Sequence, residues 1–250
     1  MNKPPIFQNP ESDGGSFYWT GKKDQTTAVL LFHGFTATTV EVRQMAKFLN
    51  NNGYTVVGPL LPGHGVSPEE LNHVRYTDWI AAAENSYLEL QRKFDRVVVL
   101  GESMGGLCAL WLAALHPEIT GILVFAPALK IPGIWQSHLI WPFMKHLEKK
   151  NVDLSSPWQG FNVVPLRAAA QLHKFQQNIK KYLTEIKQPI MVFQGKLDST
   201  IDPISSPEVL ERVSSEEKEL VWLEESGHCI LLDKQMDLVT RLCLEFIKNL

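Results

Sequence analysis

The residues with the clearest chemical potential are a serine and the glycines on either side of it. Residues Gly101–Gly105 read G-E-S-M-G and match the pattern G-x-S-x-G. This pattern presents a serine on a sharp turn from a strand into a helix, where glycines remove the Cβ atoms that would clash. A serine presented in this way can attack a carbonyl carbon once a base removes its proton. Ser103 is therefore the candidate nucleophile of a serine hydrolase.

The segments around Ser103 supply the elements that such a turn needs. Arg96–Leu100 is a short β-branched and apolar run that predicts a buried strand, and Gly105–Leu115 predicts a helix. The alternative is a glycine-rich turn whose serine merely caps that helix, since serine is a favoured N-cap residue. The strand, turn and helix stand in the order that a nucleophile requires, and this order favours the catalytic interpretation.

The same turn offers hydrogen-bond donors for a developing oxyanion. The first N–H groups of a helix have no partner within it, so the N–H of Met104 is a candidate donor. A second donor is expected where the predicted strand Ala28–His33 runs into a glycine turn, and Phe35 is the candidate. His33, at the end of that strand, is interpreted as a residue that braces the oxyanion loop.

A base is needed because an unassisted hydroxyl is a poor nucleophile at neutral pH. In serine hydrolases built on a strand–turn–helix, the chain order is nucleophile, acid, histidine, so the base should follow Ser103. His228 lies in a loop between the predicted strand Leu220–Leu223 and the last predicted helix. The other later histidines lie at a helix end or in the segment 127–187: His116, His138, His146 and His173. We therefore predict that His228 is the base.

The acid that orients this histidine should also follow a strand. Asp198 comes after the apolar run Ile190–Gly195 and a glycine turn. Asp202, four residues further on, is a rival because loops of this kind often carry two acids. The prediction is Asp198, with Asp202 left open, and the resulting triad would form and hydrolyse an acyl-enzyme.

The cysteines favour neither metal chemistry nor a disulfide framework. Cys229 stands beside His228, but no CxxC or HExxH spacing supports a metal site, so we expect neither a metal nor a cofactor. The other cysteines, Cys108 and Cys243, are too few and too scattered for a disulfide framework. This usage is typical of a reducing cytoplasm, which is the expected compartment.

The strands and helices that position these residues are predicted from a pattern that recurs along the chain. Short apolar runs, glycine turns and longer amphipathic stretches follow one another along most of the chain. Continuous apolar strands that alternate with helices are typical of a mostly parallel sheet covered on both faces. The predicted fold class is thus α/β. The predicted strands are Ala28–His33, Tyr54–Gly58, Val97–Gly101, Gly121–Ala126, Ile190–Gly195 and Glu219–Leu223. The predicted helices are Val40–Asn50, Tyr76–Phe94, Gly105–Leu115, Glu208–Val213 and Gln235–Lys248.

One segment, about residues 127–187, interrupts this alternation. It contains many large apolar residues and several prolines and glycines but no clear strand, and it is too long for a plain crossover. We expect a small helical cap over the carboxyl edge of the sheet, inserted into a single domain of residues 1–250. Its aromatic residues are expected to line an acyl pocket, or alternatively to form the cap's own core: Trp135, Trp141, Phe143, Trp158 and Phe161.

Charge and hydropathy exclude other classes of protein. The formal net charge is −3 and no long basic run occurs, which argues against nucleic-acid binding. The apolar runs are strand-sized, so no integral membrane segment is expected. The first residues show no apolar stretch of the length that a secretory signal requires. The expected partner is a small-molecule ester, and the sequence does not indicate an oligomeric state.

Taken together, the motifs resemble the α/β-hydrolase fold from about Ala28 to Leu250, and within it bacterial carboxylesterases and monoacylglycerol lipases. The segments that carry the resemblance are His33–Thr36, Pro62–Gly65, Gly101–Gly106, Gly195–Asp198 and Ser226–His228. The resemblance implies a mostly parallel sheet flanked by helices, a small helical cap and hydrolysis of short- to medium-chain esters or monoacylglycerols. It also implies that the first segment lines the oxyanion hole and that His64 is structural.

Two alternatives remain beside an ester hydrolase. A thioesterase or another acyl hydrolase would use the same triad, and an inactive binding module could share the fold. A haloalkane dehalogenase is disfavoured because its nucleophile is an aspartate, whereas residue 103 is a serine. The presence of all three expected triad residues favours an enzyme over a binding module.

Overall fold

A seven-stranded sheet forms the centre of the computed structural model, which describes residues 6–150 and 152–250. The strand order is β11-β10-β6-β5-β3-β4-β2, and all neighbouring strands are parallel except β2, which runs antiparallel to β4 at the edge. The prediction of a mostly parallel sheet is confirmed. The strands are β2 (Phe17–Trp19), β3 (Thr27–Phe32), β4 (Thr55–Gly58), β5 (Arg96–Glu102), β6 (Gly121–Phe125), β10 (Ile190–Gly195) and β11 (Lys218–Leu223).

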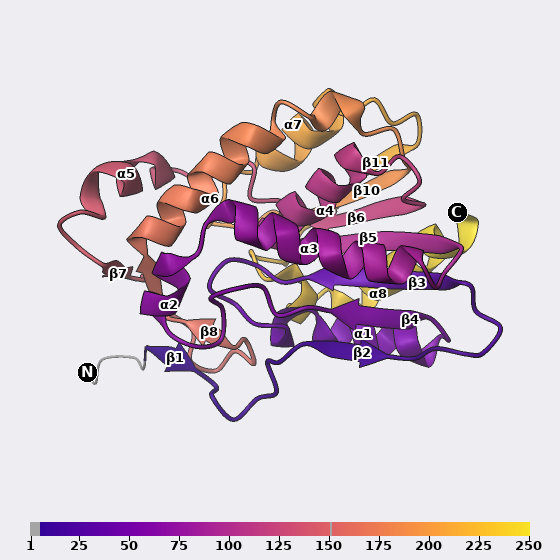
Figure 1. The fold of residues 1–250 in the computed structure, drawn as a ribbon, viewed down its shortest axis with the longest axis horizontal. Coiled ribbons are helices and arrows are strands. Elements are labelled where there is room, and N and C mark those ends of the chain that lie inside the picture. The colour runs from indigo at the N-terminus through magenta and orange to yellow at the C-terminus, as the bar shows by residue number, and fades with distance from the viewer. Residues whose placement is uncertain (1–5, 151) are drawn as a thin grey trace.

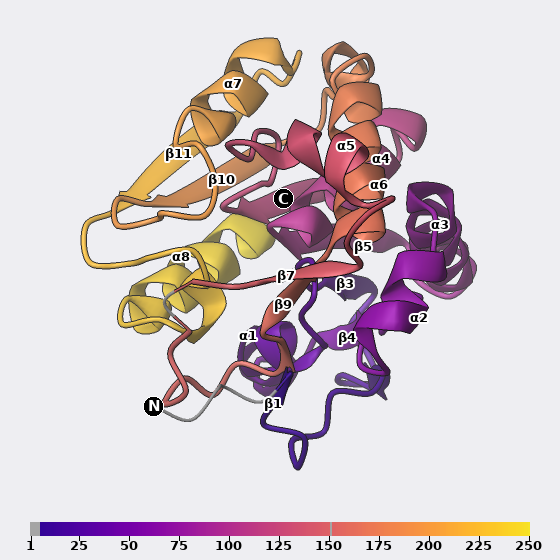
Figure 2. The same ribbon diagram turned by 90° about the vertical axis from the view of Figure 1, so that its left-hand side faces the viewer.

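The central strands are buried on both faces, which explains why their sequences do not alternate between apolar and polar residues. Figures 1 and 2 show α1 (Val40–Asn51) and α8 (Met236–Asn249) together on one face, and α3 (Tyr76–Gln91) and α4 (Met104–Leu115) on the other. Helix α4 is buried along most of its length, since β5, β6 and α6 (Leu166–Ile179) all pack against it. Two shorter helices are α2 (Pro68–His73) and α7 (Ser205–Arg212).

The segment between β6 and β10 differs in part from the expectation. It does contain helices, but it also contains three short strands where the sequence predicted none. These strands have two or three residues, too few for a periodic pattern, and β8 pairs with β1, which lies far away in the chain. The elements are η1 (Ile134–Gln136), α5 (Ser137–Ile140), β7 (His146–Glu148), β8 (Gly160–Phe161), β9 (Val163–Pro165), α6 and η2 (Leu183–Glu185), and the partner strand is β1 (Phe7–Gln8).

The parallel arrangement brings distant parts of the sequence to one edge of the sheet. Strands β3, β5 and β10 end immediately before His33, Ser103 and the turn that carries Asp198. The loop after β11 carries His228 and leads into the short helix η3 (Ile230–Leu232). Because parallel strands present their carboxyl ends at the same edge, this is where ligands of open α/β sheets bind.

Candidate active site

Ser103 lies on a backbone turn that few residues other than glycine adopt. Its φ is 55° and its ψ is −114°, between the end of β5 and the first residue of α4. A Cβ on Gly101 would lie 2.1 Å from the carbonyl oxygen of Gly105, and one on Gly105 would lie 2.2 Å from that of Phe32. The two glycines therefore allow the strand, turn and helix to pack closely enough to hold the strained serine.

Three side chains form a continuous line of hydrogen bonds at this edge. The Oγ atom of Ser103 lies 3.0 Å from Nε2 of His228, and Nδ1 of His228 lies 2.8 Å from Oδ2 of Asp198. Because a carboxylate accepts, Nδ1–H donates to Asp198, and Nε2 is left to accept the proton of Ser103. The structure thus brings together the three residues that the sequence predicted as nucleophile, base and acid.

Backbone N–H groups and a side-chain amide hold the Asp198 carboxylate in place. Its Oδ1 accepts the N–H groups of Thr200 (2.8 Å) and Ile201 (3.1 Å), and the amide of Gln194 donates to Oδ2 at 3.3 Å. Burial raises the pKa of this carboxyl, but the hydrogen bond and charge of His228 and the backbone amides outweigh burial and hold it below its usual range. Asp198 is therefore ionised at neutral pH.

The rival acid, Asp202, forms an ion pair with Lys130. Its carboxylate lies 2.6 Å from the ammonium of Lys130 and accepts the N–H of Ile204 at 3.2 Å. These contacts hold its pKa below the usual range while the group stays close to solvent. Asp202 therefore takes part in a surface ion pair, and Asp198 is the acid that is hydrogen-bonded to His228.

The two candidate oxyanion donors lie where the sequence placed them, on the turn after β3 and at the start of α4. Within the described part of the chain, neither the N–H of Phe35 nor that of Met104 has a protein acceptor. Both therefore remain available to a ligand oxygen.

His33 orients the peptide that carries the first of these donors. Its Nε2 accepts the N–H of Leu61 at 3.0 Å, so its Nδ1–H donates to the carbonyl oxygen of Gly34, 2.9 Å away. That carbonyl belongs to the same peptide unit as the N–H of Phe35. Burial lowers the pKa of His33 to about 4, which keeps the ring neutral and its Nε2 able to accept.

His64 packs behind this loop and does not reach Ser103. Its Nδ1 contacts the carbonyl oxygens of Leu61 (3.2 Å) and Pro62 (3.1 Å), and its ring stands edge-on to His33, with ring centres 4.8 Å apart. Burial holds the pKa of His64 well below its usual range, so the ring stays neutral.

Of the five predicted pocket aromatics, one side chain is linked to the site and four are not. Trp158 is linked to the oxyanion loop through Glu41, because its Nε1–H donates to Oε1 of Glu41 at 3.1 Å and Oε2 of Glu41 accepts the N–H of Gly34. Phe143 is 91% exposed and Trp135 is 53% exposed, so the protein encloses neither ring. Phe161, also named as a candidate, is buried in the core beside Phe7.

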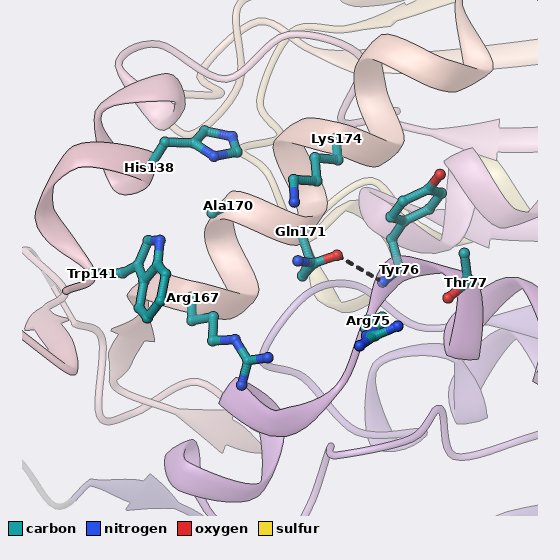
Figure 3. Close-up of a pocket in the computed structure, with 9 residues that line it drawn as sticks. All are labelled: Arg75, Tyr76, Thr77, His138, Trp141, Arg167, Ala170, Gln171 and Lys174. Atoms are coloured by element: carbon teal, nitrogen blue, oxygen red, sulfur yellow. Dashed lines mark hydrogen bonds between the residues drawn. The ribbon is translucent and has the colours of Figure 1, made fainter.

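Trp141 lines a groove of about 650 Å³ between the cap segment and the start of α3. Figure 3 shows its ring facing this groove from the end of α5, across from Arg75 at the start of α3 and beside Arg167 of α6. The guanidinium of Arg167 lies 5.9 Å from the centre of the Trp141 ring. None of the triad residues lines this groove, so the structure separates Trp141 from the nucleophile.

Sequence reasoning missed the buried ionisable groups around the triad. Glu41 and Glu102 are almost fully buried, and Lys149 is half-buried with its ammonium 2.6 Å from Oγ1 of Thr36. Glu41 stands in the first turn of an amphipathic helix, where an acidic residue is ordinary, so its pattern gave no signal of a role. Across residues 6–150 and 152–250, no group of three or more potential ligands is arranged to hold a metal ion.

The comparisons with known proteins identify the family of the chain. Residues 27–130 match a family model described as the alpha/beta hydrolase fold, and residues 156–235 match one described as serine aminopeptidase, S33. The chain is 32% identical over 229 residues to a carboxylesterase of Bacillus subtilis, covering 89% of this chain and 93% of that protein. It is 32% identical over 222 residues to a thermostable monoacylglycerol lipase of a Bacillus species, covering 87% and 89%.

The structure is also similar to a solved structure along nearly the whole length of both chains. That solved structure comes from work on two metagenome-derived lipolytic enzymes, LipS and LipT, and superposes with a TM-score of 0.89 at 28% identity, covering 95% of this chain and 98% of that chain. The chain therefore belongs to the α/β-hydrolase family that includes these carboxylesterases and monoacylglycerol lipases, and it is a hydrolase. None of the helices in the described ranges has the length and apolar character needed to span a bilayer.

Proposed function

We propose that this hydrolase cleaves carboxylic esters with short- to medium-chain acyl groups, including monoacylglycerols, through an acyl-enzyme on Ser103. The observation that carries the proposal is the continuous line from Ser103 through His228 to Asp198, with contacts of 3.0 and 2.8 Å on a strained turn. Such a line serves both to activate a hydroxyl and to return its proton to a leaving group.

The mechanism has two halves that use the same residues. His228 takes the proton of Ser103 as Oγ attacks the ester carbonyl, and it then gives that proton to the departing alcohol. Asp198 holds the imidazole in the required tautomer and stabilises the imidazolium that forms. Water then attacks the acyl-enzyme by the same route, releasing the acid and restoring the Ser103 hydroxyl.

The N–H groups of Phe35 and Met104 would stabilise the tetrahedral oxyanion in each half. One lies on the loop after β3 and the other begins α4, whose positive N-terminal end favours negative charge. Each such donor contributes about 3 kcal/mol of transition-state stabilisation in other serine hydrolases.

The substrate class follows from the relatives and from the cap segment. One relative is a carboxylesterase and another is a monoacylglycerol lipase. Trp158, which is linked to the oxyanion loop through Glu41, is the aromatic residue that we retain as a substrate contact. A thioesterase with the same triad remains the alternative, and a thioester arm in the assay separates the two.

We further propose that the enzyme works in the reducing cytoplasm on small molecules, without a cofactor and without nucleic-acid binding. The three cysteines are free thiols, and two of them are buried. The net charge of −3 gives no electrostatic footprint for phosphate backbones.

A panel of p-nitrophenyl esters from acetate to palmitate, with a monoacylglycerol and an acyl thioester, tests this proposal. We expect the highest kcat/KM among short and medium acyl chains, and turnover of the monoacylglycerol. Absence of turnover on every oxygen ester would overturn the proposal. Faster cleavage of the thioester than of its matched oxygen ester would favour the alternative.

A further inference from the structure

Glu41 places a buried carboxyl group at the meeting point of three parts of the site. The residue is 3% exposed and lies in the first turn of α1. Its Oε2 accepts the N–H of Gly34 at 2.5 Å, and its Oε1 accepts Nε1–H of Trp158 at 3.1 Å. The thiol of Cys229 points to the same Oε1, with 3.9 Å between sulfur and oxygen.

These three donors belong to different functional segments. Gly34 is part of the oxyanion loop, defined here as residues 34–38, and Trp158 is part of the cap segment. Cys229 directly follows the candidate base. One carboxyl group therefore connects the loop that binds the oxyanion, the cap, and the loop that carries His228.

In space, Gly34 lies between the Glu41 carboxyl group and the nucleophile Ser103. A Cβ built on Gly34 would lie 3.0 Å from Oε2 of Glu41 and 3.2 Å from Cβ of Ser103. Gly34 is thus enclosed between the Glu41 carboxyl group and the nucleophile. A change in the Glu41 side chain would first displace this glycine and the peptide that follows it.

The cap segment is joined to the same loop by further hydrogen bonds. The N–H of Phe161 donates to the carbonyl oxygen of Thr36 at 2.9 Å, and the N–H of Thr38 donates to that of Gln159 at 3.1 Å. The ammonium of Lys149 donates to Oγ1 of Thr36 at 2.6 Å and lies 4.4 Å from the centre of the Trp158 ring. The position of the oxyanion loop therefore depends on contacts from the cap.

Helix α1 does not itself require a buried acid at this position. An exposed carboxylate in the first turn would give the same favourable interaction with the helix dipole without the cost of burial. Burying a carboxylate is unfavourable unless hydrogen bonds compensate for the lost hydration. The three donors supply that compensation, and each of them belongs to the surroundings of the site.

The charged and titratable groups around Glu41 favour its ionised form over that of Glu102. Burial raises the pKa of Glu41 above its usual range, and the Gly34 amide, His228, Trp158 and Lys149 offset that rise only in part. Burial and the proximity of Glu41 raise the pKa of Glu102 further, well above its usual range. Cys229, the remaining neighbour, keeps its proton. Only donors point at Glu41, which is the environment of an ionised carboxylate.

We propose that Glu41 is a positioning residue of the oxyanion hole: its carboxylate holds Gly34 so that the Phe35 N–H faces the reacting carbonyl, and it ties this loop to the cap through Trp158. The inference rests on the proposed ester hydrolysis. Glu41 does not touch the substrate, and it acts through the geometry of the peptide that does.

The central test compares Glu41→Gln with wild-type enzyme on one p-nitrophenyl ester. Glutamine turns an NH2 group toward one or more of the three donors, so it cannot satisfy all of them. We expect kcat to fall about 10- to 100-fold, which is no more than the fall caused by removing a whole oxyanion donor. We expect KM to change less than about threefold. Affinity for a trifluoromethyl ketone, whose adduct carries an oxyanion, should fall by the same factor as kcat/KM.

A second variant keeps the test decisive if Glu41→Gln does not fold. Trp158→Phe removes one donor to Glu41 and retains an aromatic ring, and we expect kcat to fall about 3- to 10-fold at an unchanged melting temperature. Glu89→Gln, on the exposed face of α3, is the matched control and should retain wild-type kinetics.

The parallel loss of kcat/KM and of ketone affinity separates a positioning role from simple stabilisation, because a loss of stability alone would lower neither in the folded enzyme. Wild-type kcat and ketone affinity in a folded Glu41→Gln, or unchanged kcat in Trp158→Phe, would overturn this inference and leave the proposed function intact. Absence of ester turnover by the wild-type enzyme would overturn both.

Discussion

The carboxyl edge of the sheet and the cap segment differ in how deeply their candidate functional side chains are buried and how firmly they are held. At the sheet edge, Ser103 and Asp198 are almost fully buried, and each is held by backbone hydrogen bonds or by strained dihedrals. In the cap segment, Trp135, Trp141 and Phe143 are all substantially exposed. The cap contacts the site mainly through the short stretch 158–161 and Lys149.

This difference shows where the chemistry is fixed and where it can vary. Side chains at strand ends inherit their positions from a core that admits little change, because buried strands and close-packed glycines leave no alternative conformation. The cap uses two- and three-residue strands and exposed rings, which constrain each residue far less. We infer that substitutions at the sheet edge will have much larger effects than substitutions in the outer cap.

The largest expected effect distinguishes the two candidate acids. Asp198→Asn should lower kcat about 10³- to 10⁴-fold, because an amide in place of the carboxylate no longer enforces the required tautomer of His228. Asp202→Asn, which removes only a surface ion pair with Lys130, should change kcat less than about threefold. Steady-state kinetics on one ester measure both, and a larger loss in Asp202→Asn would contradict the assignment.

The next prediction compares two phenylalanines of the cap segment. Phe161 is fully buried, so Phe161→Ala should lower the free energy of unfolding by about 3–5 kcal/mol. Phe143 is 91% exposed, and Phe143→Ala should change it by less than about 0.5 kcal/mol. Denaturant titrations provide both values. A raised KM of Phe143→Ala for longer acyl esters would show that this ring reaches the substrate after all.

A third prediction concerns the close packing beneath the nucleophile. A Cβ on Gly105 would lie 2.2 Å from the carbonyl oxygen of Phe32, so Gly105→Ala should cost about 3 kcal/mol of stability or more. Gly15→Ala is the control, since the nearest atom to its added Cβ is 3.4 Å away, and it should change stability by less than about 1 kcal/mol. Equal melting temperatures for the two variants would contradict this explanation of the glycine pattern.

The smallest expected effect concerns the thiol beside the base. Burial and the nearby carboxylates hold the pKa of Cys229 well above its usual range, so the unreactive thiol form predominates at neutral pH. Iodoacetamide at pH 7.5 should therefore leave ester turnover unchanged within about twofold, with alkylation becoming faster only as the pH rises toward that raised pKa. Rapid inactivation at neutral pH would indicate a reactive cysteine at this site.

Much of the fold could be predicted because the central strands have continuous apolar sequences. The run Ile190–Gly195 coincides with β10, and the predicted helix at Val40–Asn50 ends one residue before α1 does. The edge strand β2 and the short strands of the cap were missed, since two or three residues carry no periodic signal. Their positions depend on partners far away in the sequence.

The candidate site divides in the same way. Ser103, His228 and Asp198 could be proposed from the sequence because each follows a recognisable strand and turn, and the structure brings their side chains into hydrogen-bond contact. Glu41 and Lys149 could not be proposed, because their importance lies in burial and in contacts across more than 100 residues of chain, such as that between Glu41 and Trp158. Trp141 was named for its residue type alone, and its side chain faces a groove that none of the triad residues lines.

The most direct test of the central claim is to locate the covalent adduct of a fluorophosphonate probe. Such probes react with serines that are activated as nucleophiles. We predict stoichiometric labelling of the wild-type enzyme, a single modified peptide that carries the adduct on Ser103, and no labelling of Ser103→Ala with its melting temperature preserved. An adduct on any other residue, or undiminished labelling of Ser103→Ala, would contradict the account.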